Sequence, residues 1–374
     1  MSVRIVRLHE IASTSSGGTP SRGNKDYYNG DIPWVKSGEL PDGEIVKVEE
    51  KISEFGLNNS SAKLLLEGTL LIAMYGATVG RLGILTFPAA TNQAVCAITP
   101  SEQLDRDYLF YWLLSIRDSL VTTSFGGAQP NISQTVIRNL EIPFYPIEKQ
   151  RQIAARLKAQ LAEVDKARQA AGVQLRETTK LADSIIADSI KRGQSEPHQL
   201  GDVLDEVKQG IGETWKDYPL LGATRNGLAP AKEPAGKKPE RYKPVFPGTV
   251  FYNPMRILIG SIAYVDDDDT PGITSPDYVA LRGKEGQVDS RWFYYWLRSP
   301  LGEQCINSLA RGAVRERMLF NRLVDGKVDL PKYKEQLIAS KALAELKPMH
   351  KAIEIKLQEI NLLPQKILAQ AFEQ

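Results

Sequence analysis

The sequence contains only two cysteines and three histidines. Cys96 and Cys305 stand alone, without the paired spacing of a metal site or a redox motif, and His9, His198 and His350 are scattered along the chain. Isolated cysteines of this kind are typical of a reducing compartment. The sequence therefore predicts a cytoplasmic protein with no metal site of its own.

Long hydrophobic runs are also missing. The most apolar stretch, Tyr108 to Ile116, is far shorter than the about 20 residues that a membrane-spanning helix needs. Residues 1–10 lack the apolar core and the cleavage site of a signal peptide. The formal net charge is only +2. Any nucleic-acid interface must therefore gather its basic residues on one face.

Motifs for catalysis are absent as well. The sequence has no GxxxxGK[ST] phosphate loop and no GxGxxG turn that opens a helix. An adenine methyltransferase should carry Asn or Asp, two prolines and an aromatic residue at the reacting amino group; the nearest stretch, residues 253–256, has one proline and no aromatic residue. We therefore predict that the chain is not an enzyme on its own and that it binds no cofactor.

One acidic run, Asp266 to Asp269, stands out. Calcium loops separate their carboxylates with other residues and include a glycine, and this run does neither. A solvated turn between two strands is the favoured interpretation, and a metal site is the alternative.

Two long polar segments dominate what is present. Residues 148–191 contain no proline and one interior glycine, Gly172, which predicts a single long helix. Its apolar residues recur at alternating steps of three and four, which is typical of a coiled coil. These residues are Leu157, Leu161, Val164, Ala171, Leu175, Ala182 and Ile185, with Arg168 and Thr178 at two further positions of the same seam. Such a helix would extend roughly 65 Å, and it cannot bury its apolar stripe alone.

Residues 331–374 repeat this spacing and are the expected partner. Their seam consists of Leu343, Leu346, Ile353, Leu357, Ile360, Ile367 and Ala371. A proline inside a helix costs about 3 kcal/mol, so we expect Pro348 and Pro364 to kink or segment this helix. The simplest arrangement is an antiparallel pair. Two unrelated surface helices on separate cores remain the alternative.

The segments outside the two helices repeat one another in order. The matched pairs are GTLLIAMYG at Gly68 with GTVFYNPMR at Gly248, TNQAVCAI at Thr91 with TSPDYVAL at Thr274, YLFYWLLS at Tyr108 with WFYYWLRS at Trp292, FGGA at Phe125 with LARGA at Leu309, and NLEIPFYPIEKQ at Asn139 with GKVDLPKYKEQ at Gly326. The chain is therefore predicted to be a duplication of one unit, a globular domain followed by a helix, with pseudo-two-fold symmetry.

These patterns predict an α+β protein in which two long antiparallel coiled-coil helices separate two strand-rich globular domains. The expected segments are 1–146, 147–192, 193–330 and 331–374. The repeats differ most in their loops, because GGTPSRGNKDYY corresponds to the basic stretch GATRNGLAPAKEPAGKKPERYK. A shared scaffold with divergent loops indicates two copies of one domain that recognise different targets.

The order GGTPS, the Trp34-Val35 loop, GATVG, TNQA, GGAQPNIS and an EKQ or EQ helix resembles the specificity subunit of Type I restriction-modification systems. The resemblance implies two target recognition domains on a helical spacer, which read a bipartite, asymmetric site in double-stranded DNA for phage defence. It also implies that two adenine methyltransferase subunits dock on the chain, and that restriction and translocation subunits join them. S-adenosylmethionine, ATP and Mg would then belong to these partners.

Candidate DNA contacts follow from residue type. In the first domain the cationic candidates are Arg22, Lys25, Lys36 and Arg81, and the polar candidates are Ser21, Tyr75, Asn92, Gln93, Gln129 and Asn131. In the second domain Lys237, Lys238, Arg241 and Lys243 are expected at phosphates, and Arg225, Arg256, Arg311, Arg315 and Arg317 include the expected base contacts. Arginine suits guanine, and Asn or Gln suits adenine. Each polar residue can equally be a turn former or a backbone cap.

Two further hypotheses remain open at this point. The chain could be an interaction scaffold of two binding modules on a coiled coil with no DNA role, or the targeting subunit of a related Type II-like methylation system. If the long helix sets the spacing between two half-sites, an insertion within residues 160–180 should lengthen the unread gap and leave both half-sites unchanged.

Overall fold

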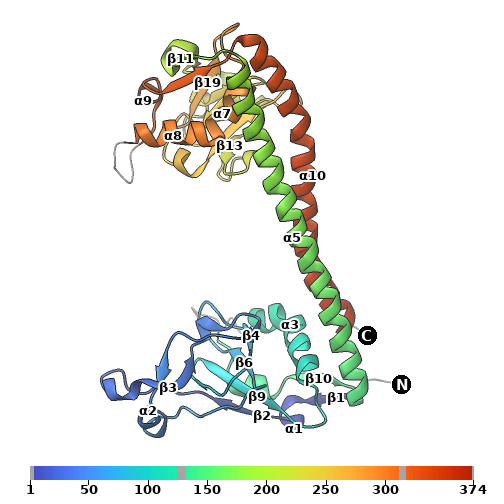
Figure 1. Ribbon diagram of the computed structural model, residues 1–374. Helices are drawn as coiled ribbons and strands as arrows, with labels where there is room; N and C mark the ends of the chain where they lie inside the picture. The colour runs from blue at the N-terminus through green and yellow to red at the C-terminus, as the bar shows by residue number, and fades with distance from the viewer. Residues whose placement is uncertain (1–3, 124–130, 311–316, 373–374) are drawn as a thin grey trace. The chain divides into compact units, whose positions relative to one another are not determined.

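The computed structural model describes residues 4–123, 131–310 and 317–372 (Figure 1). The chain forms two compact units. Unit 1 comprises residues 1–169 and 358–374, and unit 2 comprises residues 170–357. Each of the two long helices therefore contributes one part to each unit.

Unit 1 is built on a five-stranded sheet. Its order is β2 (Ala12–Ser16), β9 (Val95–Pro100), β6 (Leu70–Ala73), β7 (Leu82–Leu85) and β4 (Gly43–Ile45). Only the β4–β7 pair is parallel. Strand β6 is buried on both faces, because Leu70 packs into one apolar cluster with α3 (Arg106–Thr123), while Leu71 packs into another with Leu40. The two-residue period of a strand places neighbouring side chains on opposite faces in this way.

Smaller elements complete unit 1. They are β1 (Arg4–Arg7) paired with β10 (Glu141–Phe144), β3 (Tyr28–Val35) paired with β5 (Lys51–Ile52) and β8 (Ala90–Thr91), the helices α1 (Leu8–Ile11), α2 (Glu54–Asn58) and α4 (Gln134–Arg138), and the 3₁₀ turns η1 (Lys25–Tyr27) and η2 (Ser37–Glu39). Trp34 at the end of β3 is 1% exposed, so it is a core residue, and its indole Nε1 donates to the Gly18 carbonyl at 3.0 Å.

Unit 2 repeats the sheet without the edge strand β4. Its order is β12 (Leu204–Glu206), β19 (Val279–Gly283), β16 (Thr249–Tyr252) and β17 (Ile262–Val265), all antiparallel. Around it lie the pairs β11 (Glu196–Gln199) with β20 (Lys327–Leu330), β13 (Leu221–Thr224) with β14 (Gly227–Pro230), and β15 (Lys243–Val245) with β18 (Gly272–Thr274). The remaining elements are α6 (Leu200–Val203), α7 (Ser290–Arg298), α8 (Pro300–Leu309), α9 (Phe320–Leu323), η3 (Gly212–Asp217), η4 (Pro239–Arg241) and η5 (Ile257–Ile259).

The strand registers confirm the predicted duplication. The sequence repeat aligns Leu70 with Val250, and Ile98 with Leu281. In the structure Leu70 pairs with Ile98 in unit 1, and Val250 pairs with Leu281 in unit 2. Two separately aligned motifs therefore pair with each other in the same register in both units, so the repeated motifs form equivalent strands.

In each unit, a buried glutamine near the start of a long helix joins that helix to the globular part of the unit. The Gln150 side chain accepts from the Asp105 N–H at 2.8 Å and donates to the carbonyls of Gln103 and Tyr145. The Gln336 side chain does the same with the Asp289 N–H, at 2.9 Å, and the carbonyls of Gln287 and Pro331. Both glutamines are 0% exposed. The EKQ and KEQ motifs of the sequence repeat are thus hydrogen-bonding anchors.

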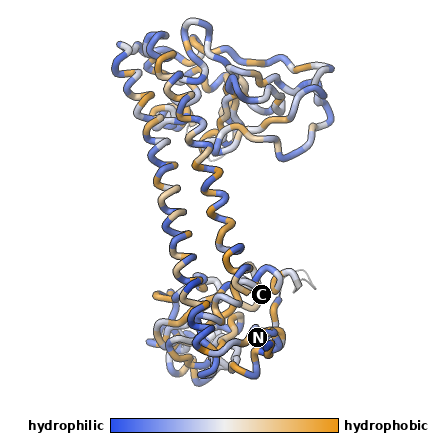
Figure 2. The backbone as a smooth tube through the Cα atoms, turned by 90° about the vertical axis from the view of Figure 1, so that its right-hand side faces the viewer, coloured by the Kyte–Doolittle hydropathy of each residue, from blue (hydrophilic) through white to orange (hydrophobic). Residues whose placement is uncertain are grey.

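The two long helices are α5 (Ile147–Arg192) and α10 (Tyr333–Phe372). In unit 1, Leu157 shares a core cluster with Leu368 and Ala371, and Arg168 Nε donates to Asn361 Oδ1 at 2.9 Å. Residue numbers rise along α5 while they fall along α10, so the pair is antiparallel. Hydrophobic and hydrophilic residues alternate along both helices, as a shared seam requires (Figure 2).

The same direction holds in unit 2. Thr178 Oγ1 lies 3.0 Å from His350 Nδ1, and Ile186 packs with Ala339 and Leu343. The predicted antiparallel seam is therefore confirmed, with its polar positions paired across the helices. Ile186 is fully buried whereas the predicted Ile185 is half-buried, so at this point the buried position lies one residue beyond the expected heptad position.

The second helix is not segmented at its two prolines, contrary to one of the two expected outcomes. Helix α10 is continuous through Pro348 and Pro364. Burial of Leu343, Ile360 and Leu368 along its length supplies tertiary packing, which outweighs the local propensity of a proline.

Candidate nucleic-acid interface

The sheet of unit 1 gathers several predicted residues at one end, which we call the loop end of unit 1. It consists of the loop 17–25 after β2, the loop 74–81 between β6 and β7, and residues 92–93 before β9. Because these neighbouring strands are antiparallel, the end of one and the start of the next lie together. The loop end therefore contains the predicted residues Ser21, Arg22, Lys25, Tyr75, Arg81, Asn92 and Gln93.

Hydrogen bonds fix this arrangement. The Gly18 N–H donates to the Thr91 carbonyl at 2.9 Å, and the Tyr75 hydroxyl donates to the Gln93 carbonyl at 2.5 Å. A Cβ on Gly17 would lie 2.2 Å from Thr91 Oγ1, and a Cβ on Gly18 would lie 2.2 Å from the Ala62 nitrogen, so the two glycines allow the loop to pack closely against both segments. The motifs GGTPS and TNQA are thus two sides of one packed contact.

The polar candidates of unit 1 have specific neighbours. The Asn92 side chain accepts from the Ala94 N–H at 3.2 Å, and the Gln93 side chain accepts from Thr19 Oγ1. Asn131 forms an isolated β-bridge with Tyr75 and is exposed. Asn92 is thus partly a turn former, while Gln93 and Asn131 are exposed beside Tyr75.

A carboxylate that sequence reasoning missed lies at this end. Glu50 forms an ion pair with Arg22 and lies 3.6 Å from Lys36 Nζ. The hydrogen bond from Arg22 is the main reason that the pKa of Glu50 is lowered, and burial opposes it. The Arg22 guanidinium also lies over the rings of Tyr28 and Trp34, at 4.6 and 5.1 Å. Lys36 Nζ also lies 3.8 Å from a Glu49 oxygen, so both predicted cations have carboxylate partners within the unit.

Unit 2 has an equivalent loop end, formed by the loop 253–261 between β16 and β17 with the residues after β12 and before β19. Arg256 lies in this loop. The Ser261 hydroxyl donates to the Ala223 carbonyl at 2.7 Å, which holds the β13–β14 turn and Arg225 beside it. The Met318 N–H donates to the Pro254 carbonyl at 3.0 Å and brings Arg317 there. Three predicted arginines from distant segments thus converge on one loop.

A second basic group lies on η4 and the residues before it. Lys237, Lys238 and Arg241 are exposed, and within the described residues none has a side-chain ion pair. The Ile211 N–H donates to the Tyr242 carbonyl at 2.7 Å, so this group lies beside the residues that follow β12.

Lys243 is differently placed. Its ammonium donates to the Tyr278 carbonyl at 2.7 Å and lies 3.9 Å from a carboxylate oxygen of Glu206. Burial lowers the pKa of Lys243, and the charges of Glu206 and Asp277 oppose that effect. With 12% of its side chain exposed, Lys243 is poorly placed to contact a phosphate. Gln129, Arg311 and Arg315 lie outside the described residues.

The acidic run is more than a solvated turn, which corrects the prediction. Asp267 and Asp268 are exposed, but Asp266 is 6% exposed and forms ion pairs with Arg291 and Lys347. Burial would raise the pKa of Asp266, but the hydrogen bond from Arg291 and the nearby positive charges lower it overall. The acidic run links the β17–β18 turn to α7 and α10. The sequence does not indicate this role, because the partners lie on distant helices.

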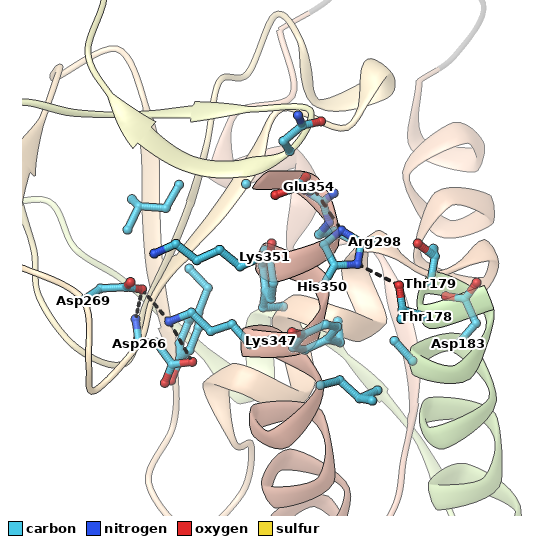
Figure 3. A pocket seen from close by; sticks show the side chains of 18 residues that line it. Thr178, Thr179, Asp183, Asp266, Asp269, Arg298, Lys347, His350, Lys351 and Glu354 are labelled. Carbon is cyan, nitrogen blue, oxygen red and sulfur yellow. Dashed lines mark hydrogen bonds and ion pairs between the residues drawn. The ribbon is translucent and has the colours of Figure 1, made fainter. Parts of the chain in front are cut away.

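A pocket of about 330 Å³ lies in unit 2 between α5, α10, α7 and the β13–β14 hairpin (Figure 3). Lys347 contacts Asp266 and Asp269 on one side, and His350 bridges to Thr178 on the other. Asp183 on α5 has a pKa that burial raises. Lys347 pairs with Asp266 and Asp269, and Arg298 donates to backbone carbonyls, which favours a structural role in holding the helix pair to the sheet of unit 2.

Within residues 4–123, 131–310 and 317–372, no group of three or more His, Cys, Asp or Glu side chains could hold a metal ion. None of the helices described is both long and apolar enough to cross a membrane. Cys96 is buried, and burial raises the pKa of its thiol to about 12, so it is not a reactive thiolate near neutral pH.

Comparison with known proteins gives consistent results. Residues 2–171 match the family model of the Type I restriction modification DNA specificity domain. The MjaVIII specificity subunit of a Type I restriction enzyme from Methanocaldococcus jannaschii is 23% identical over 95% of this chain and 88% of the relative. The MjaIX specificity subunit from the same organism is 28% identical over 40% of this chain. In that alignment this chain spans about a third, 36%, of the length of the relative.

Solved structures share the fold. One solved structure comes from work on the complex assembly and conformational transition of the type I R-M system. This chain matches it with a TM-score of 0.68 and 19% sequence identity, over 99% of this chain and 97% of the other. The HsdS subunit from Thermoanaerobacter tengcongensis has a TM-score of 0.51 and 20% identity, over 99% of this chain and 96% of that one.

The duplicated sheets, the glutamine-anchored helix pair and the two loop ends define a protein with two related domains on paired long helices. Residues 2–171 therefore match the Type I restriction modification DNA specificity domain, and over most of its length the chain is similar to a Type I restriction enzyme specificity subunit.

Proposed function

We propose that this chain is the DNA sequence-recognition subunit of a Type I restriction-modification complex. The observation that carries the proposal is that one sheet end recurs in both units with a different set of polar and basic residues. A repeated scaffold with different loops suits a bipartite, asymmetric site, because each loop end can contact its own half-site.

The residue types indicate which side chains contact phosphates and which contact bases. Exposed Lys237, Lys238 and Arg241 supply phosphate contacts, which provide affinity and register without sequence information. Base contacts in the major groove come from Arg225, Arg256 and Arg317 in unit 2, and from Gln93 and Asn131 in unit 1. A good bidentate contact discriminates between bases by about 1 to 3 kcal/mol.

The proposal assigns chemistry to partner subunits. Two adenine methyltransferase subunits dock on the chain, and restriction and translocation subunits complete the assembly in the cytoplasm. S-adenosylmethionine, ATP and Mg act in those subunits, while this chain holds no catalytic residue and no cofactor.

The direct test is a methylation map. The full chain is co-expressed with its cognate methyltransferase subunit in a host without other adenine methylation, and methylated adenines are located by long-read sequencing. A single bipartite motif with an unread gap, lost when this chain is omitted, is the expected result. A methylome that is unchanged without the chain, from an active methyltransferase, would contradict the proposal and favour an interaction scaffold.

Helix length gives a second test. Adding seven residues between 160 and 180 preserves the heptad seam and lengthens α5 by about 10 Å. The mapped gap should lengthen while both half-sites keep their sequence. An altered half-site would contradict the role of the helix as a spacer.

A further inference from the structure

Loop 253–261 of unit 2 exposes three large apolar side chains. Met255, Leu258 and Ile259 are 55%, 46% and 63% exposed. Single exposed apolar residues are common on proteins, but three within five residues form a local patch. This patch, which we call the apolar tip, lies at the loop end of unit 2.

The apolar tip is rigidly held. Ile257 between its members is 3% exposed and belongs to the core cluster of unit 2. The Asn253 N–H donates to the Ser261 carbonyl at 3.2 Å, and the Met255 N–H donates to Asn253 Oδ1 at 3.0 Å, so the loop is closed at its base. The left-handed Gly260, with φ of +80°, ends η5 and turns the chain into β17. The exposed side chains are thus presented on a preorganised loop.

Positive charge surrounds the tip. Arg256 lies between its members, Arg225 is held beside Gly260, and Arg317 lies beside Pro254 through Met318. Arg298 braces the back of the loop, because its guanidinium donates to the carbonyls of Arg225 and Ile262 at 2.7 and 3.0 Å. A purely apolar partner would leave these arginines without acceptors, whereas DNA supplies both acceptors and apolar groups.

Unit 1 has no such tip in the corresponding loop. Residues 76–80 read GATVG, and Gly76 and Gly80 both adopt positive φ, of +85° and +79°. The short glycine turn presents no large exposed apolar side chain comparable to Leu258 or Ile259. The feature therefore belongs to one unit, as a determinant of one half-site should.

We propose that the apolar tip contacts the 5-methyl groups of thymine in the major groove of the second half-site. The inference rests on the proposed DNA-recognition function and adds a base preference to it. Thymine is the standard base that presents a methyl group in the major groove, and apolar side chains recognise it there. The surrounding arginines contact phosphate or guanine acceptors and fix the depth at which the tip enters the groove.

The experiment replaces the methyl group without changing any hydrogen bond. The full complex with its methyltransferase subunit is titrated with duplexes of the mapped motif, in which each thymine of the second half-site is replaced in turn by uracil. Removing a contacted methyl should weaken binding by the wild-type complex about fourfold. The same measurement is made for Leu258→Ala and Ile259→Ala, with Val46→Ala, an exposed apolar residue of unit 1, as the matched control.

The variants should bind the thymine duplex less tightly and lose their preference for thymine over uracil, whereas Val46→Ala should keep both. Equal binding of thymine and uracil duplexes at every position by the wild-type complex would overturn the inference. Variants that lose complex assembly instead of the thymine preference would assign the tip to a protein partner and also overturn it. If no bipartite motif exists, the proposed function itself has failed, which the methylation map reveals beforehand.

Discussion

The two units keep the same anchors and differ in the charges at their loop ends. Gln150 and Gln336 make matching sets of three hydrogen bonds. In contrast, Arg22 and Lys36 of unit 1 face Glu50, while Arg256 of unit 2 has no carboxylate partner among the described residues. The two units thus share the contacts that hold the globular part of each unit to its long helix, and they differ in the loops proposed to contact DNA.

The largest expected effect comes from the shared anchors. Gln150→Leu and Gln336→Leu each remove three hydrogen bonds from a fully buried side chain to backbone groups, so each should lower the free energy of unfolding of its own unit by about 3 kcal/mol. Hydrogen exchange measured by mass spectrometry on the full chain localises the loss. Gln160→Leu, at an exposed position of α5, is the control. Very different losses in the two units would break the equivalence of the anchors.

The acidic run of unit 2 should give the next largest effect. Asp266→Asn leaves Arg291 and Lys347 without their buried carboxylate, and we expect a loss of about 2 kcal/mol that is confined to unit 2. Because the folded-state pKa of Asp266 is lowered, its contribution is present above the ordinary pKa of an aspartate and is lost as pH falls through the folded-state value.

Urea unfolding between pH 3 and 7 checks this sign. The wild-type protein should lose more stability on acidification than Asp266→Asn does. Asp267→Asn, whose side chain is 83% exposed, should behave as the wild type. An Asp266→Asn protein with an unchanged acid profile would show that the buried pair contributes nothing.

The smallest expected effect sharpens the electrostatic contrast. Glu50→Gln releases Arg22 in unit 1, while Lys36 keeps Glu49 at 3.8 Å, so DNA affinity of the full complex should rise. The slope of log affinity against log salt should steepen by about 0.9 for each released cation that reaches a phosphate. Glu44→Gln, at an exposed position of β4, is the control. An unchanged slope would mean that Glu50 does not restrain Arg22.

Local pattern and repetition predicted much of the fold. The helix expected at 148–191 is observed at Ile147–Arg192, and the repeat alignment matched Leu70 with Val250, which occupy equivalent positions in the two sheets. Periodicity succeeds here because each helix and strand must bury one face. The continuous helix through Pro348 was not predicted, because packing along the whole helix decides it.

The candidate site was predicted less completely. The residue types at both loop ends could be selected from motifs, and strand pairing explains why they converge. Their electrostatic partners could not be selected, because Glu50 is 28 residues from Arg22 in the chain and Asp266 pairs with α7 and α10. Such pairs depend on tertiary contacts that carry no local sequence signal. The apolar tip lies within a stretch that the sequence presents only as a turn.

The central claim is that each unit recognises its own half of one DNA site. Its most direct measurement is the methylation motif produced by the full complex with Gln93→Ala in unit 1, compared with Arg256→Ala in unit 2. We predict that the first variant relaxes or weakens one half of the bipartite motif and that the second affects only the other half. Variants that alter the same half, or both halves together, would contradict the account.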